Sequence, residues 1–138
     1  MLVDSSALVA VLEEEPEAAL FASLMYDAEH LYLSAATLLE VSIVMQSRRK
    51  ERGENALNEL LSLYKVEIVP FTSDQADLAR RAHKRYGRGN HPAKLNFGDC
   101  ISYAVAKDMG EPLLYKGEDF DKTDCEKVDW QSCVHKDN

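Results

Sequence analysis

The sequence has 138 residues, 46% of them hydrophobic and 29% charged, which suits one globular domain with a real core and excludes a disordered chain. No apolar stretch approaches the roughly 20 residues that a membrane-spanning helix needs. The formal net charge of −8 argues against nucleic-acid binding through overall charge. Three cysteines favour neither a disulfide framework nor a zinc site, and the N-terminus lacks a signal-peptide pattern, so we expect a cytoplasmic protein.

Short apolar strands alternate with helices along the chain. We predict strands at residues 2–3, 31–34, 66–69 and 113–115, with a short last strand at 128–130. We predict helices at about 5–12, 17–28, 37–49, 55–64, 73–86 and 96–110. This alternation predicts an α/β fold, a three-layer sandwich in which helices flank a central, mostly parallel sheet, with residues 1–138 forming a single domain.

Four carboxylates lie at junctions between these elements. Asp4 follows the first strand, and Glu40 lies in the first turn of the helix after the second strand. Asp99 opens the helix that Asn96 caps, and Asp119 follows the strand at 113–115. Because ligands of open α/β sheets bind beyond the carboxyl ends of the strands, we expect these acids at one rim. Clustered carboxylates repel each other, and a hard cation such as Mg²⁺ or Mn²⁺ stabilises them. Such an ion suits the hydrolysis of phosphate esters.

Each acid also has a purely local explanation. Asp4 can cap the following helix, and Thr37 with Glu40 matches a capping box. Asp99 can complement the helix dipole, and Asp119 can stabilise a turn. The residues alone leave both explanations open for every acid.

Basic residues gather in two places despite the negative net charge. The stretch between Asp77 and Asp99 contains no acid, and its basic residues include Arg80, Arg85, Arg88 and Lys94. A second cluster lies at residues 48–52. Both clusters are suited to hold a polyanion, and the alternative is that they are solvated helix faces.

Four segments of the chain resemble one known family. They are residues 3–17 (VDSSALVAVLEEEPE), 33–44 (LSAATLLEVSIV), 95–107 (LNFGDCISYAVAK) and 112–124 (PLLYKGEDFDKTD). In order and spacing they resemble the PIN-domain ribonucleases, most of all the VapC toxins of bacterial toxin–antitoxin modules. The resemblance implies a PIN-like fold and a Mg²⁺- or Mn²⁺-dependent endoribonuclease that cleaves RNA by an activated water, leaving a 5′-phosphate and a 3′-hydroxyl.

The resemblance also implies roles for individual residues. It makes Asp4, Glu40 and Asp99 catalytic, metal-binding acids, and Ser6 a helper of the water or the metal. The fourth acid of the family precedes a phenylalanine, which points to Asp119, although Glu118 and Asp121 flank it. Gly98 lacks a Cβ and so permits a close approach of neighbouring backbone or ligand.

Partners follow from the same resemblance. We expect an RNA substrate bound through Arg80, Arg85, Arg88 and Lys94, and a cognate VapB-like antitoxin that inhibits the enzyme. The candidate surfaces for the antitoxin are the acidic pocket and the apolar residues of the N-terminal helices, namely Leu12, Leu20, Phe21, Leu24 and Met25. The alternative, favoured for most of these apolar positions, is that they belong to the core. A homodimer or a toxin–antitoxin hetero-oligomer is expected. The alternatives are a PIN-like module that binds RNA or protein without cleavage and, more remotely, a receiver-like phosphoacceptor domain.

Overall fold

A computed structural model describes residues 1–89 and 91–135 and contains a parallel sheet of four short strands. The strands are β1 (Leu2–Val3), β2 (Tyr32–Ser34), β3 (Glu67–Val69) and β4 (Leu113–Leu114), in the order β3-β2-β1-β4. The helices are α1 (Ser5–Leu12), α2 (Ala18–Asp27), α3 (Ala35–Leu63), α4 (Ser73–Tyr86), α5 (Phe97–Met109) and α6 (Gln131–His135). All described strand pairs are parallel, so the predicted sheet type is confirmed.

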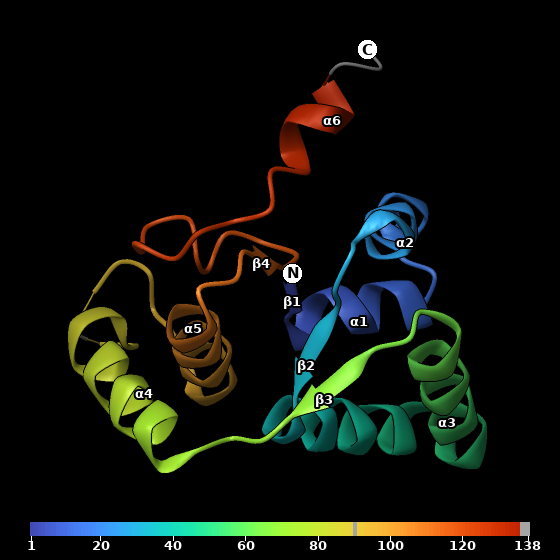
Figure 1. The fold of residues 1–138 in the computed structure, drawn as a ribbon, viewed down its shortest axis with the longest axis horizontal. Coiled ribbons are helices and arrows are strands. Elements are labelled where there is room, and N and C mark those ends of the chain that lie inside the picture. Colours follow the sequence, from blue (N-terminus) through green and yellow to red (C-terminus); the bar gives the residue numbers. More distant parts are fainter. Residues whose placement is uncertain (90, 136–138) are drawn as a thin grey trace.

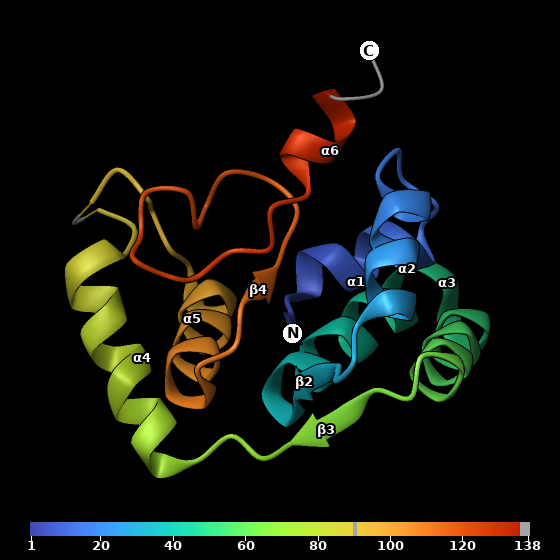
Figure 2. The same ribbon diagram turned by 45° about the horizontal axis from the view of Figure 1, so that its top comes forward.

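Helices cover both faces of the sheet, because neighbouring strand residues point to opposite sides. Leu2 and Leu113 pack into the core under α4 and α5, whereas Val3 and Leu114 pack into the core under α1, α2 and α3. Figures 1 and 2 show α4 and α5 on one side of the strands and the other three long helices on the opposite side. The three-layer arrangement expected from the sequence is therefore confirmed.

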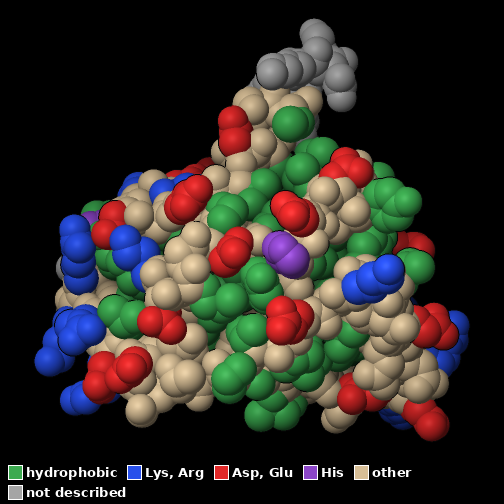
Figure 3. Space-filling view, in the orientation of Figure 1, with side chains coloured by type: hydrophobic (Ala, Val, Ile, Leu, Met, Phe, Trp, Pro, Cys, Tyr) green, Lys and Arg blue, Asp and Glu red, His purple; other side chains and the backbone are tan. Residues whose placement is uncertain are grey.

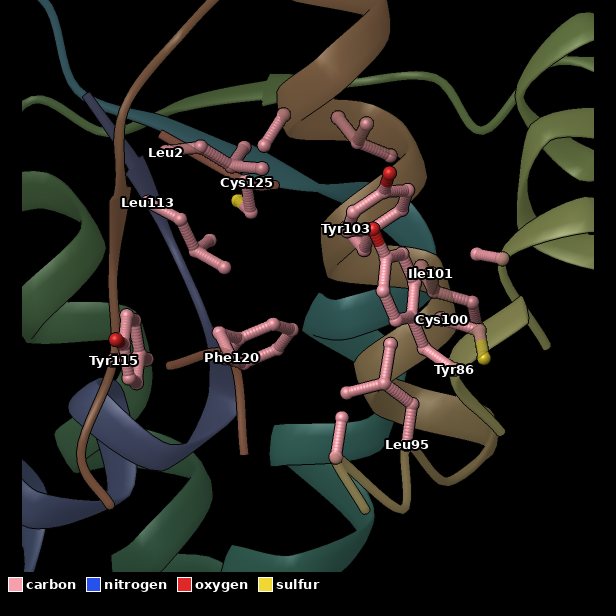
Figure 4. Packing of buried hydrophobic residues seen from close by; sticks show 14 residues of the cluster. Leu2, Tyr86, Leu95, Cys100, Ile101, Tyr103, Leu113, Tyr115, Phe120 and Cys125 are labelled. Atoms are coloured by element: carbon pink, nitrogen blue, oxygen red, sulfur yellow. The ribbon is translucent and has the colours of Figure 1, made fainter. Parts of the chain in front are cut away.

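The core on the α4–α5 side holds α5 in place. Leu113 and Phe120 face Tyr103, Ile101 and Leu95 across this core (Figure 4). Burying side chains of this size contributes roughly 1.5–3 kcal/mol each. The start of α5 is thereby fixed relative to β1 and β4, which matters for the acid in its first turn.

Two helices expected at 37–49 and 55–64 form one long α3 with a kink at Lys50. Lys50 has φ 53° and ψ −136°, which a non-glycine residue rarely adopts. The helix resumes immediately after it, and a Cβ at Gly53 would lie 2.4 Å from the Met45 carbonyl oxygen. The close approach of the two helical segments therefore requires glycine at this position.

The C-terminal part differs from the prediction. Residues 128–130 do not form the predicted strand. The pairing with β4 is limited to a single bridge between Lys127 and Leu113, in which the Val128 amide donates to the Leu113 carbonyl. The short helix α6 follows and was not predicted. Among the described residues, no helix has the length and apolar character needed to cross a membrane.

Candidate active site

The candidate site lies where the sheet changes its winding direction. The strand β1 has β2 on one side and β4 on the other. After β1 the chain continues to β2 and β3 on one side of it, and it returns to β4 on the other side, so the strand order reverses at β1. Asp4 directly follows β1, and its amide donates to the Leu114 carbonyl at 2.9 Å. Such switch points are the usual ligand sites of open α/β sheets.

Asp4 is a buried carboxylate whose two oxygens both accept hydrogen bonds. Its Oδ2 accepts from the Ser6 hydroxyl at 2.6 Å and from the Ser6 amide at 3.1 Å, which caps α1. Its Oδ1 accepts from the Ser102 hydroxyl at 2.5 Å. Burial raises the pKa of Asp4, and the Ser102 and Ser6 hydrogen bonds oppose that rise. Asp4 therefore caps α1 and also belongs to the acidic cluster.

Ser102 was missed by the sequence reasoning. It lies three residues after Asp99, so the two side chains share one face of α5. Ser102 is almost fully buried, and its hydroxyl points at Asp4 from an element 98 residues away in sequence. The spacing to Asp99 was the only signal in the sequence, and a serine at that spacing is too common to single out.

Glu40 approaches α5 at a glycine. A Cβ built on Gly98 would lie 2.6 Å from Glu40 Oε2 and 3.0 Å from Oε1, so only glycine leaves room for this carboxylate. The sequence predicted a close approach at Gly98 by backbone or ligand, and the group that approaches it is instead the side chain of Glu40. Burial and the charge of Asp4 raise the pKa of Glu40, and a hydrogen bond from Ser5 opposes them.

The capping-box explanation of Glu40 is wrong. The helix α3 begins at Ala35, and its N-cap is Ser34, whose hydroxyl accepts from the Ala36 amide at 3.3 Å. Thr37 lies inside the helix and is buried. Glu40 therefore belongs to the second turn and not to the first, and its side chain is directed by the contact with α5 rather than by the helix start.

Asp99 caps its helix and also belongs to the cluster. Its Oδ2 accepts from the Asn96 amide at 3.1 Å, and its own amide donates to Asn96 Oδ1 at 2.9 Å. This capping box confirms Asn96 as the N-cap. Burial, followed by the charges of Asp4 and Asp119, raises the pKa of Asp99 from 3.8 to about 7.

Among the three neighbouring acids after β4, Asp119 is the one that reaches the cluster. Its charge and its hydrogen bonding to Asp99 both raise the pKa of Asp99. Asp121 instead accepts a hydrogen bond from the Tyr115 hydroxyl at 2.5 Å. Glu118 and Asp119 are both exposed, and of these two only Asp119 acts on the pKa of Asp99. The structure thus brings together Asp4, Glu40, Asp99 and Asp119, which come from four separate elements or loops.

Ser6 connects Asp4 to the loop that carries Asp119. Its hydroxyl donates to Asp4 and accepts from the Lys116 amide at 3.0 Å. The Lys116 ammonium pairs with Glu15 and lies 3.1 Å from Glu17, so the loop is also tethered to the turn between α1 and α2. This arrangement assigns Ser6 a positioning contact with the acid that follows β1.

The donor set fits a hard cation held partly through water. Within residues 1–89 and 91–135, no three Asp, Glu, His or Cys side chains are arranged to ligate one ion directly. Both Asp4 oxygens and one Asp99 oxygen are engaged by hydrogen-bond donors of the protein. Mg²⁺ keeps several waters and needs only one or two direct carboxylates. Oxygen donors whose pKa values are raised by burial and mutual repulsion are compatible with such an ion.

The predicted RNA-binding residues lie on α4 and on the loop before α5. Lys and Arg side chains gather over α4, at the left of Figure 3. Arg85 lies 3.8 Å from Asp124 and 4.8 Å from the centre of the Tyr86 ring, so it is partly engaged within the protein. Arg80, Arg88 and Lys94 are exposed.

The apolar residues proposed for antitoxin contact divide into two groups. Phe21 and Met25 are fully buried in the core under α1, α2 and α3, so they are not available to a partner. Leu12, Leu20 and Leu24 are half-buried and keep some exposed surface. Only this second group remains a candidate surface.

Known proteins share both the sequence and the fold. The sequence matches the PIN domain family over residues 1–125. It is 48% identical over 128 residues to a ribonuclease VapC of Mycolicibacterium smegmatis, covering 93% of this chain and 99% of the relative. It is 46% identical over 129 residues to ribonuclease VapC30 of Mycobacterium tuberculosis, covering 93% and 98%.

Two solved structures have the same fold at low sequence identity. The crystal structure of Mycobacterium tuberculosis VapC20, a toxin that cleaves the sarcin–ricin loop, superposes with a TM-score of 0.75 at 19% identity, covering 92% of this chain and 97% of that one. VapBC2 of Rickettsia felis, bound to a DNA fragment from its promoter, gives 0.75 at 14% identity, covering 93% and 96%. The chain therefore belongs to the PIN-domain family and, within it, to the VapC proteins.

Proposed function

We propose that this protein is a Mg²⁺- or Mn²⁺-dependent endoribonuclease toxin that a VapB-like antitoxin neutralises. The observation that carries the proposal is the convergence of Asp4, Glu40, Asp99 and Asp119 at the switch point of the sheet. Burial raises the pKa values of Asp4, Glu40 and Asp99, and the charges of neighbouring acids raise those of Glu40 and Asp99 further, which makes the cluster unfavourable without a cation. Relatives named as ribonucleases, 46–48% identical, support the reaction class.

One or two of the four acids would bind the ion directly and the others would bind it through water, while the hydroxyl groups of Ser6 and Ser102 would position Asp4. When bound, Mg²⁺ or Mn²⁺ lowers the pKa of a water and neutralises charge that develops on the phosphoryl oxygens. Ser6 and Ser102 fix the Asp4 carboxylate from two sides, so its orientation does not depend on substrate. Gly98 leaves the space in which Glu40 lies. Attack of water in line with the leaving oxygen leaves a 5′-phosphate and a 3′-hydroxyl.

The reaction is tested by incubating RNA with the purified protein in Mg²⁺, in Mn²⁺ and in EDTA. Asp99→Asn and Glu40→Gln should each lower the cleavage rate by orders of magnitude, because each removes one charge with little change of shape. Asp74→Asn, in the first turn of α4, and Glu59→Gln, exposed on α3, are matched controls and should keep full activity. Full activity in EDTA would refute the metal-dependent mechanism.

In this proposal the exposed basic residues bind the phosphate backbone of the RNA. Each phosphate that they neutralise should steepen the salt dependence of binding by roughly 0.7 in log–log slope on single strands. Replacing Arg88 and Lys94 by glutamine should flatten the slope and leave Mg²⁺ binding intact. Arg85 should matter less than the sequence suggested, because its guanidinium already lies 4.8 Å from the centre of the Tyr86 ring. An unchanged slope would mean that the basic residues between Asp77 and Asp99 form only a solvated surface and do not contact RNA.

The antitoxin is proposed to use the half-buried leucines of α1 and α2. A disordered tail can lay an amphipathic helix against Leu12, Leu20 and Leu24, and can send an arginine towards the acidic cluster. The test is to co-express the chain with the small protein encoded beside it and to assay RNA cleavage before and after proteolysis of that partner. Equal activity in both samples would reject inhibition by that partner.

The alternative functions differ in what they require of the site. A PIN-like module that only binds RNA or protein does not need a complete acidic cluster, whereas all four acids converge in this protein. Absence of cleavage in Mn²⁺ with retained RNA binding would favour that alternative. The receiver-like phosphoacceptor domain is not retained, because the chain belongs to the PIN-domain family.

A further inference from the structure

A groove of about 530 Å³ lies between α4 and α5. Its lining includes the apolar side chains Phe71, Ala79, Ile101 and Phe97, together with Cys100. The sulfur of Cys100 points away from Leu113 and Phe120 (Figure 4), on the side of α5 opposite the sheet. The volume lies within the roughly 300–1,000 Å³ of ligand pockets. None of the four acids lines the groove, so it is a feature separate from the acidic cluster.

Phe97 is the unusual residue of this groove. It is the first residue of α5 and is 85% exposed, whereas Phe21 and Phe120 are at most 1% exposed. An exposed ring of this size is informative where it lies beside a groove rather than singly on the surface. Phe97 is two residues from Asp99, and side chains two residues apart point to different sides of a helix, so the ring and the acid lie on different faces at the same end of α5.

The charged side chains along this groove are all basic among the residues described. Arg80, His83 and Lys84 lie three and four residues apart on α4 and therefore share one face of the helix. Arg80 also lies 3.3 Å from Asp77, but this pair is exposed and such pairs contribute little. An apolar floor with a basic rim, on a chain of net charge −8, is complementary to a nucleotide, which combines a flat apolar base with an anionic phosphate.

We propose that this groove binds an unpaired base of the RNA, stacked on Phe97, while Arg80 and Lys84 contact the flanking phosphates. The inference rests on the proposed ribonuclease function and adds a binding subsite to it: the groove takes an unpaired nucleotide of the RNA at a position separate from the acidic cluster. A base within a duplex has both faces stacked and is not free to enter the groove. Because every base has a π-face, the groove selects unpaired structure rather than a particular base.

The test measures RNA binding without cleavage. Fluorescence anisotropy in EDTA compares two labelled probes, a short unstructured oligoribonucleotide and a backbone of the same length and charge built from abasic residues. Phe97→Ala should weaken binding of the oligoribonucleotide roughly 5- to 100-fold, the range that loss of one base–aromatic stack produces, and should leave the abasic probe unaffected. Phe97→Trp should retain binding. Tyr26→Ala removes an aromatic ring that is 81% exposed on α2 and should change neither affinity.

Three outcomes would overturn the proposal. Equal weakening of both probes by Phe97→Ala would mean that the ring acts through the local fold and not through a base. Unchanged affinity for both probes would mean that no base uses the groove. Conversion of a dimer to monomers by Phe97→Ala, seen in sedimentation, with unchanged affinity per protomer, would assign the groove to a second copy of the chain.

Failure of the groove and failure of the enzyme are distinguishable. A wild-type protein that cleaves RNA in Mn²⁺ but binds it independently of Phe97 would reject the groove alone. A wild-type protein that binds the oligoribonucleotide through Phe97 but cleaves nothing would support the groove and reject the ribonuclease.

Discussion

Replacing Asp99 by asparagine should stabilise the metal-free protein at pH 8, although Asp99 caps α5. The aspartate charge is unfavourable there, because burial and the charges of Asp4 and Asp119 raise the pKa of Asp99 to about 7. Asparagine removes this charge. Its amide oxygen can still accept the hydrogen bond from the Asn96 amide, which Asp99 accepts at 3.1 Å. The capping box is therefore retained while the repulsion is lost.

The sign and size of the effect follow from proton linkage. The ordinary pKa of 3.8 applies to the unfolded chain, and a pKa of about 7 applies to the folded one. Between these values the folded state binds more protons, so this group lowers stability as pH rises, and the loss is complete above pH 7. The full difference would correspond to about 4 kcal/mol. Solvent around the exposed Asp119 screens the repulsion, so we expect about 1–2 kcal/mol.

Urea unfolding in EDTA between pH 5 and pH 8 measures this effect. The Asp99→Asn protein should be the more stable one at pH 8, and the difference should shrink towards pH 5. Asp74→Asn is the matched control, since Asp74 also lies in the first turn of a helix with a capping box. It should lose about 0.3–1 kcal/mol through the helix dipole. The reasoning is refuted if Asp99→Asn destabilises the protein as Asp74→Asn does.

Three further substitutions test single contacts. Gly98→Ala should lower the cleavage rate at least about tenfold without lowering the melting temperature, because the new Cβ displaces the Glu40 carboxylate while alanine favours the helix. Ser102→Ala should lower the free energy of unfolding by about 1–3 kcal/mol, since it leaves a buried Asp4 oxygen without its hydroxyl donor, and urea unfolding measures this. Lys50→Gly should raise the melting temperature, corresponding to about 1 kcal/mol, because glycine tolerates φ 53°. Unchanged cleavage in the first variant, or unchanged stability in the other two, would contradict the corresponding contact.

The sequence by itself determined the features that depend on near neighbours. The strand at Leu2–Val3, the helix that follows Asp4 and the Asn96 cap were all predicted and are present. Apolar pairs bounded by capping residues are local signals, because a cap involves side chains within about three residues of the helix start. The alternation of such segments also predicted the parallel α/β fold. The four candidate acids were named from junction positions and from the resemblance to the PIN domain.

Only the tertiary structure decided which groups meet. The strand order puts β4 beside β1, and this brings the loop after β4, which carries Asp119, to the start of α5 and Asp99. The hydrogen bond from the Ser102 hydroxyl to Asp4 joins residues that are 98 positions apart in the sequence, and no local sequence pattern predicts it. The start of α3 was also misplaced, because Thr37 resembles a cap in sequence but is buried inside the helix. Caps are chosen by chain-local geometry, whereas repulsion, burial and shared hydrogen bonds depend on distances that arise only when the strands are paired.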